Sequence, residues 1–126
     1  MERTARERDV VVDMEAGVEH LSRGTVRHVD RLLVVIEPYF RSLETGKRTV
    51  ELGIELGIPR VEVVANKVRD GGDRTAIREF CEARGLEVVV EVPWDDAFRE
   101  AERAGSAPLD FDPDAEAIRA IRGLVE

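Results

Sequence analysis

The sequence holds one cysteine, Cys81, and few aromatic side chains, which make up 5% of its 126 residues. A single cysteine excludes an intrachain disulfide, and aliphatic side chains must therefore build the core. No apolar run approaches the roughly 20 residues that a membrane-spanning helix needs. Residues 1–8 are rich in charge and lack the apolar segment of a signal peptide. We therefore expect a cytoplasmic protein with no membrane partner and with a flexible segment at residues 1–8.

Basic residues are outnumbered, with 19 Lys and Arg against 27 Asp and Glu, which gives a net charge of −8. Nucleic-acid binding depends on basic patches that displace counterions from phosphates, so no nucleic-acid partner is expected. The composition, 43% apolar and 37% charged, is typical of a soluble globular protein. The length fits a single domain over residues 1–126.

Four apolar runs rich in β-branched residues indicate strands. They are residues 9–13, 31–37, 60–66 and 86–92. Continuous apolar runs of this length are typical of strands that are buried on both faces of a parallel sheet. Helical segments separate these runs, and this alternation predicts right-handed βαβ units. We expect an α/β fold, doubly wound, with a mostly parallel sheet of about four strands.

Helices are expected between these strands and after the last one. Each would begin at a side chain that accepts a hydrogen bond from a free helix amide. The expected capping residues are Ser42, Asp73, Asp95 and Asp112. Gly57 and Gly85 would end the first two helices, since glycine tolerates the left-handed backbone common at helix ends. Cys81 lies on the apolar face of the second helix, which predicts a packed core thiol.

Three polar segments directly follow predicted strands. They are Asp13–Gly17, Asn66–Lys67 and Pro93–Asp95. Ligands of open α/β sheets bind at the carboxyl ends of the strands, so we expect all three segments at one edge of the sheet. This shared location favours a nucleotide site over the structural explanations that each segment has when it is taken alone.

The first segment suits the phosphate end of a nucleotide. Asp13 is placed for a magnesium-linked carboxylate, and Gly17 leaves room for a terminal phosphate. A strand-ending Asp that caps the following turn explains Asp13 equally well.

The other two segments suit a nucleobase. The amide of Asn66 offers a donor and an acceptor side by side, and the alkyl stem of Lys67 can lie along a base. Taken alone, a turn-forming Asn is the commoner explanation of this pair. Pro93 ends its strand. A tryptophan such as Trp94 is more often a core residue than a stacking partner of a ligand. Asp95 is expected to cap the next helix, whether or not it also contacts a ligand.

Residues 13–25, DMEAGVEHLSRGT, resemble the switch II region of CooC-type ATPases. These are MinD/ParA relatives (SIMIBI-class P-loop NTPases) that help load nickel into carbon monoxide dehydrogenase. The resemblance continues at Val35–Pro38, Ser42–Thr45, Val64–Val68 and the Pro93–Asp95 turn. It covers essentially the whole chain, as the C-terminal half of such a protein.

The resemblance implies roles for individual residues. Asp13 would hold Mg²⁺ through water and help to place the attacking water, and Gly17 would lie near the γ-phosphate of ATP. Asn66 would recognise the adenine of ATP or ADP beside Lys67, with Pro93, Trp94 and Asp95 lining the base from the other side. The switch and interface residues would be Glu15, Glu19, His20 and Arg23. These would face a dimer partner, in a homo- or heterodimer, or a client metalloenzyme.

Two family features are missing from the sequence. The glycine-rich Walker A loop with its two lysines is absent, and so is the Cys-x-Cys nickel motif. Without the loop we expect little or no ATPase activity from this chain alone, and a need for an N-terminal half that carries the loop. The absent loop strand would leave a sheet edge open. The neighbouring strands could close the gap, the other half could fill it, or two copies could pair.

Two other functions remain open. One is a MinD/ParA-like ATPase with a different client. The other is a degenerate, non-catalytic module for dimerisation or interaction, which the absent loop favours.

Overall fold

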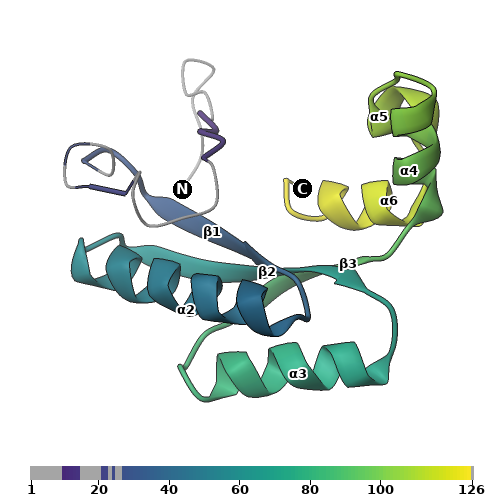
Figure 1. Cartoon of the computed structure of the whole chain (residues 1–126). Helices are drawn as coiled ribbons and strands as arrows, with labels where there is room; N and C mark the ends of the chain where they lie inside the picture. The colour runs from purple at the N-terminus through teal and green to yellow at the C-terminus, as the bar shows by residue number, and fades with distance from the viewer. Residues whose placement is uncertain (1–9, 15–20, 23, 25–26, 126) are drawn as a thin grey trace.

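The computed structural model describes residues 10–14, 21–22, 24 and 27–125 (Figure 1). Its three parallel strands form one sheet in the order β1-β2-β3. The strands are β1 (Arg31–Ile36), β2 (Arg60–Val68) and β3 (Val88–Pro93). The predicted parallel α/β architecture is confirmed, with three strands in the described residues where about four were expected.

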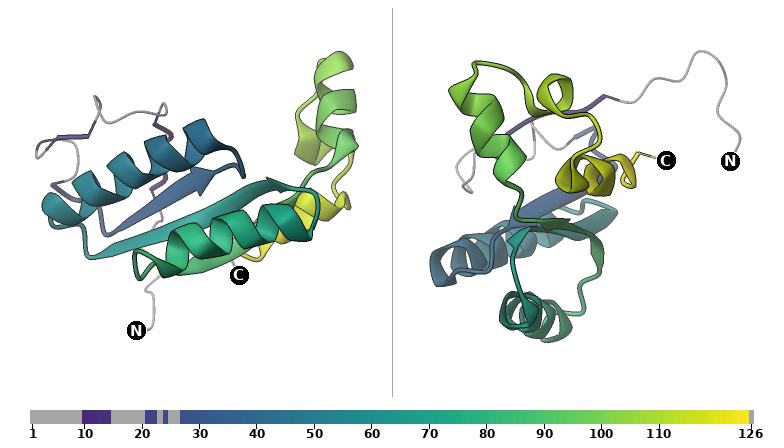
Figure 2. Two further views of the ribbon diagram at one scale, coloured as in Figure 1. Left: turned by 60° about the horizontal axis from the view of Figure 1, so that its bottom comes forward. Right: turned by 90° about the vertical axis from the view of Figure 1, so that its right-hand side faces the viewer.

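Helices lie on both faces of the sheet (Figures 1 and 2). They are α2 (Phe40–Glu55), α3 (Gly71–Glu82), α4 (Asp96–Arg103), α5 (Pro108–Phe111) and α6 (Glu116–Arg122). Helices α2 and α3 cover one face, while α6 packs against β3 on the other. None of the helices in the described part of the chain is long and apolar enough to cross a membrane.

The core lies between the sheet and the α2–α3 layer. Val34, Ile36, Val50, Val63 and Phe80 are among its buried side chains. Cys81 also lies there at 3% exposure, which confirms the predicted core thiol. Its burial raises the pKa of the thiol, although the nearby positive charge of Arg84 acts in the opposite direction, and the protonated thiol is a poor nucleophile.

Two glycines of α2 bring the helix close to β1. A Cβ atom at Gly46 would lie 2.6 Å from Cγ2 of Ile36, and one at Gly53 would lie 2.8 Å from Cδ2 of Leu32. Both distances are shorter than van der Waals contact, so any larger residue would push the helix away from the strand. This close contact fixes the position of β1 against α2.

Three of the four predicted capping residues, Ser42, Asp73 and Asp112, do not cap the expected helices. Helix α2 begins after Tyr39, and the hydroxyl of Ser42 instead accepts a hydrogen bond from the amide of Glu37 at 2.8 Å. Helix α3 is capped by Asp70, which accepts from the amide of Asp73 at 2.9 Å. The side chain of Asp73 is turned back and accepts from the amide of Arg69.

The remaining helix ends are mixed. Asp95 caps α4 as expected, and Gly57 and Gly85 have positive φ values of 80° and 64°. Asp112 caps a turn rather than a helix, because its carboxylate accepts from the amide of Asp114 at 3.1 Å. The extended backbone of Ala115 then delays the start of α6 to Glu116.

The predicted strand at residues 9–13 is wrong for residues 10–13, which belong to no strand. Val10, Val11 and Val12 are 84%, 88% and 68% exposed. A strand is stable only when its amides and carbonyls find a neighbour, and no described strand pairs with this segment. The neighbouring strands therefore do not close the expected gap. Residues 1–8, which we expected to be flexible, lie outside the described residues.

Candidate functional site

The carboxyl ends of the three strands meet at one edge of the sheet, where α2, α3 and α4 begin (Figure 1). In the parallel register, Ile36 lies opposite Ala65, and Val68 lies opposite Pro93. The predicted residues Asn66, Lys67, Pro93 and the two that follow it are therefore brought to the same edge.

Asn66 and Lys67 lie on a bulge inside β2, not in a loop after it. Ala65 pairs with Glu91 and Val68 with Pro93, so Asn66 and Lys67 together face the single residue Val92. Lys67 has φ 57°, the one positive value among the described non-glycine residues. This conformation costs about 1–2 kcal/mol in a residue with a Cβ atom. Bulges of this kind re-aim side chains and are common beside functional sites.

An ion pair fixes the Lys67 side chain. Its Nζ lies 2.7 Å from Oε1 of Glu37, which directly follows β1. The two side chains are 46% and 31% exposed, so solvent weakens the pair. Glu37 belongs to the Val35–Pro38 motif, but no role was predicted for it. The signal that could have found it is a carboxylate at the end of one strand beside an ammonium at the end of its neighbour.

The side chain of Asn66 has no hydrogen-bond partner among the described residues, although the residue is half-buried. Its carbonyl and amino groups are the kind of polar groups that folded proteins normally pair with protein or with an external partner. The arrangement leaves a donor and an acceptor, side by side, available to a ligand.

Trp94 is held by three contacts. Its amide donates to the carbonyl of Val68 at 3.0 Å, and its indole N–H donates to Asp96 at 3.2 Å. The guanidinium of Arg69 lies 3.8 Å from the centre of the ring, within the range of a cation–π interaction. The tryptophan is a half-buried residue at the edge of the site, and Arg69 occupies one face of its ring.

Asp95 has a structural role in this arrangement. One carboxylate oxygen accepts from the amide of Ala97 at 2.9 Å, and the other accepts from the amide of Ala117 at 3.1 Å. The residue thereby caps α4 and ties it to α6. Pro93 is the last residue of β3 and is half-buried beside Val68. Because both carboxylate oxygens of Asp95 accept hydrogen bonds within the fold, Pro93 and Trp94 are the better candidates to line the site.

The predicted phosphate end is not assembled in the described residues. Asp13 is exposed and ends no strand, so the predicted strand-end geometry is wrong. Gly17 and the expected switch residues Glu15, Glu19, His20 and Arg23 lie outside the described residues. Within the described part of the chain, no group of three His, Cys, Asp or Glu side chains could hold a metal ion. Mg²⁺ takes most of its octahedral oxygen ligands from water and substrate phosphates, so Asp13 could contribute to such a site only together with a bound nucleotide.

Two cavities formed by described residues lie away from this edge. One, of about 540 Å³, is lined by residues before β1 and β2, including His28, Asp30 and Gly57. The other, of about 500 Å³, lies between α3 and β3 and includes Arg78 and Val90. Neither is lined by Asn66, Lys67 or Trp94.

Comparison with known proteins gives relatives in sequence, although no protein-family model matches the chain. An ATP-binding protein of Methanocaldococcus jannaschii, MJ0823, is 41% identical over 111 residues, which are 87% of this chain and 42% of that protein. The carbon monoxide dehydrogenase accessory protein CooC of Rhodospirillum rubrum is 38% identical over 110 residues, 87% of this chain and 41% of CooC.

Solved structures match in fold. A ParA family ATPase from Chlorobium tepidum superposes with a TM-score of 0.69 and 25% identity, over 84% of this chain and 44% of that one. The MinD cell division protein of Aquifex aeolicus gives a TM-score of 0.68 and 20% identity, over 85% of this chain and 47% of that one.

The fold is therefore a part of the MinD/ParA P-loop ATPase fold. In sequence, the chain is related to CooC-type and MJ0823-type ATP-binding proteins, which confirms the resemblance found in its motifs. The chain spans less than half the length of the relatives it matches.

Proposed function

We propose that this chain, as a single domain over residues 1–126, is the nucleobase-binding part of a CooC-like ATPase. The observation that carries the proposal is the bulge in β2, which holds Lys67 in a left-handed conformation beside an unpartnered Asn66. The ATP-binding relatives support the same conclusion.

The chemistry of Asn66 fits adenine. An amide that offers one donor and one acceptor can pair with the amino group and a neighbouring ring nitrogen of adenine, as Asn side chains do when they read this base. At the edge that carries N7, guanine presents two acceptors, N7 and O6, so the amide cannot form the same pair of hydrogen bonds there. Lys67, held by Glu37, would lie along one side of the base, and Pro93 with Trp94 would form the other.

The chain alone is expected to have little or no ATPase activity. Phosphoryl transfer depends on positioning the phosphates and on neutralising the charge that develops on them. The sequence has no glycine-rich loop with a lysine to do this. Asp13 and Gly17 remain the proposed catalytic residues, with Asp13 as the water-mediated ligand of Mg²⁺. Both proposals require residues 10–13 to gain a neighbouring strand.

The proposed setting is the maturation of a metalloenzyme in the cytoplasm. The name of the Rhodospirillum rubrum relative, a carbon monoxide dehydrogenase accessory protein, supports carbon monoxide dehydrogenase as the client. Nickel as the cargo follows only from the resemblance of the motifs to CooC-type ATPases. The Cys-x-Cys nickel motif is absent from this sequence. A partner that carries the phosphate-binding loop would have to supply it, in a dimer whose switch contacts include Glu15, Glu19, His20 and Arg23.

Isothermal titration of ATP with Mg²⁺ tests the proposal. The chain would be titrated alone and mixed with the part of CooC that lies outside the match. We expect binding in the mixture, weakened at least tenfold by Asn66→Ala, with Asn66→Asp shifting the preference from ATP towards GTP. The Asp side chain accepts only, so it suits the N–H donors of guanine and cannot donate to the ring nitrogen of adenine.

A non-catalytic interaction module is the second candidate. The use of both oxygens of the Asp95 carboxylate within the fold favours it. Failure of ATP and GTP to bind either sample would support this candidate against the first.

A further inference from the structure

Arg69 and Arg84 both lie against an aromatic ring, but their guanidinium groups are partnered differently. The guanidinium of Arg84 lies 4.1 Å from the ring centre of Phe80 and donates to the carbonyl of Phe80 at 2.9 Å, just after α3. The guanidinium of Arg69 lies 3.8 Å from the ring centre of Trp94. Among the described residues, the side chain of Arg69 has no hydrogen bond and no ion pair. Arg84 thus has a structural role, whereas the donors of Arg69 remain available.

The fold places Arg69 against Trp94. Arg69 directly follows β2 and Trp94 directly follows β3, so both lie at the edge that carries the candidate site. The amide of Arg69 donates to the carboxylate of Asp73 at 2.8 Å. The amide of Trp94 donates to the carbonyl of Val68 at 3.0 Å. Because these hydrogen bonds hold both backbones, the stack is already formed in the free chain.

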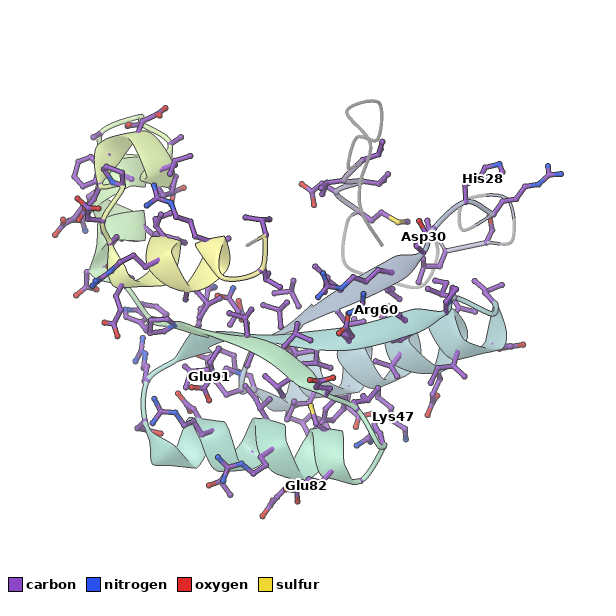
Figure 3. The ribbon with its side chains drawn as sticks, turned by 180° about the vertical axis from the view of Figure 1, so that it is seen from behind. His28, Asp30, Lys47, Arg60, Glu82 and Glu91 are labelled. Carbon is purple, nitrogen blue, oxygen red and sulfur yellow. The ribbon has the colours of Figure 1, made fainter. Side chains whose placement is uncertain are left out.

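The two cations at the end of β2 contact opposite neighbours. The ammonium of Lys67 lies 2.7 Å from the carboxylate of Glu37, which follows β1. Arg69 instead contacts the residue after β3, and it has no carboxylate partner in the described part of the chain. Arg74, the next arginine along the chain, is paired at 3.0 Å with Glu91, which is labelled in Figure 3. The end of β2 therefore carries one neutralised cation and one whose charge is free.

The exposed surface of this stack is the guanidinium and not the ring. Trp94 is half-buried, its indole N–H is bound by Asp96, and Arg69 covers one face of its ring. Arg69 itself is exposed. A guanidinium is planar, so when one face lies on a ring the other face points outward. Nucleobases stack on guanidinium planes as they do on aromatic rings. A base at this edge would therefore meet Arg69 before it met Trp94.

We infer that Arg69 is a base-stacking residue, and that the nucleobase stacks on the outer face of its guanidinium with Trp94 as the support beneath. The inference rests on the proposed function, and it makes Arg69, in place of the indole, the surface that contacts the base on the β3 side. Recognition of the base is then divided between two residues. Asn66 selects adenine through its hydrogen bonds, while Arg69 adds affinity for any base, because stacking does not read the base edge.

The test is isothermal titration of the full chain mixed with the part of the Rhodospirillum rubrum CooC relative outside the match. The ligands are ATP with Mg²⁺, GTP with Mg²⁺, and adenosine, which carries no phosphate. Arg69→Ala is expected to weaken the binding of all three by about tenfold, within the range that a stacked base contributes. The ratio of the ATP and GTP affinities should stay the same in this variant, whereas Asn66→Ala should change it.

Arg69→Lys separates stacking from charge. Lysine keeps the positive charge but has no planar group, so this variant should bind about as weakly as Arg69→Ala. Arg84→Ala is the matched control, because it removes a guanidinium from a ring that lies away from the site. It should lower the urea midpoint and leave each affinity within about twofold of the wild type.

Trp94→Leu shows whether the two residues act as a unit. If Trp94 supports the guanidinium, Trp94→Leu should weaken adenosine binding, and the double variant with Arg69→Ala should bind no more weakly than Arg69→Ala alone. Losses that add in the double variant would contradict the role of Trp94 as the support. Urea midpoints show whether each variant is folded.

Unchanged or tighter binding of adenosine to Arg69→Ala would overturn the inference, because the base would then lie elsewhere or directly on the indole. Wild-type affinity in Arg69→Lys would also overturn it, because charge alone would then explain the effect. So would a loss confined to ATP and GTP, because Arg69 would then contact phosphate. These outcomes leave the proposed function in place. If none of the three ligands bound to the wild-type mixture, the proposed function and the inference would both be refuted.

Discussion

The two faces of β1 have the same kind of sequence and opposite surroundings. Val34 and Ile36 are 5% and 0% exposed against α2, whereas Leu33 and Val35 on the other face are 36% and 58% exposed. A strand that is apolar on both faces is typical of the interior of a parallel sheet. The sequence of β1 is therefore typical of an interior strand, but in the described residues β1 lies at the edge of the sheet. Only the face that α2 covers is buried.

Strand β3, at the other edge of the sheet, has different surroundings from β1. It too has apolar residues on both faces, but α3 packs near one and α6 packs on the other, and Glu91 keeps its outer edge charged. In the described residues, helices therefore lie against both faces of β3, whereas the face of β1 that carries Leu33 and Val35 is largely exposed.

Substitutions of neighbouring residues in β1 should show the difference most strongly. Ile36→Ala is expected to lower the free energy of unfolding by about 2–5 kcal/mol, since it leaves a cavity in the closed core. Val35→Ala is expected to lower it by about 0.5 kcal/mol or less, since the side chain is largely in water. Urea denaturation measures both values.

Protein concentration provides the control for this pair. If Val35→Ala proved as destabilising as Ile36→Ala at every protein concentration, another part of the same chain would cover the face that carries Leu33 and Val35. If its effect appeared only at high concentration, self-association would be covering the face.

A smaller effect is expected in the pH dependence of the free energy of unfolding, through Glu62, which lies in register beside Leu33. Glu62 is 7% exposed on the face of the sheet that carries Leu33, and it is bound by Arg31 and Arg60. Nη2 of Arg60, which is labelled in Figure 3, lies 3.3 Å from Oε2 of Glu62. Burial acts to raise the pKa of Glu62, but the hydrogen bond and charge of Arg31, together with Arg60, outweigh it and hold the pKa below its ordinary value of 4.5.

The sign of the effect follows from this lowered pKa. The stabilisation by ionised Glu62 is complete above about pH 4.5, the value in the unfolded chain, and is lost as the pH falls through the lower folded value. Glu62→Gln should therefore cost about 1–2 kcal/mol at pH 7 and progressively less below pH 4.5. Thermal or urea unfolding of both proteins from pH 7 to pH 3 measures this. A gap between the two proteins that stays constant over this range would contradict the assignment.

The sequence predicted the features that depend on local pattern. The three paired strands, the parallel arrangement, the Asp95 cap and the buried face of α3 all follow from residue type and spacing. The choice between Asp70 and Asp73 as a cap did not, because the helix already begins at Gly71 and Asp73 therefore lies in its first turn. The strand at residues 9–13 failed because a strand also needs a neighbour.

The main features of the site depend on pairing between strands and could not be predicted locally. Asn66 and Lys67 were expected after their strand, but β2 continues to Val68, whose carbonyl accepts from the amide of Trp94. The bulge exists because Ala65 and Val68 keep their partners on β3 while two residues face one. The contact of Lys67 with Glu37 likewise depends on β1 lying beside β2.

The smallest expected effect concerns this bulge, where the backbone of Lys67 has a strained, left-handed conformation. Lys67→Gly should be more stable than Lys67→Ala by about 0.5–1 kcal/mol, because both remove the ion pair with Glu37 and only glycine adopts φ near 57° without a steric penalty. At Glu79, an exposed position inside α3, the order should reverse, with alanine favoured by about 1 kcal/mol. Urea midpoints of the four variants give both differences. Equal stability of the two Lys67 variants would mean that the left-handed backbone is not kept in solution, and the bulge would then no longer explain how Asn66 is presented to a base.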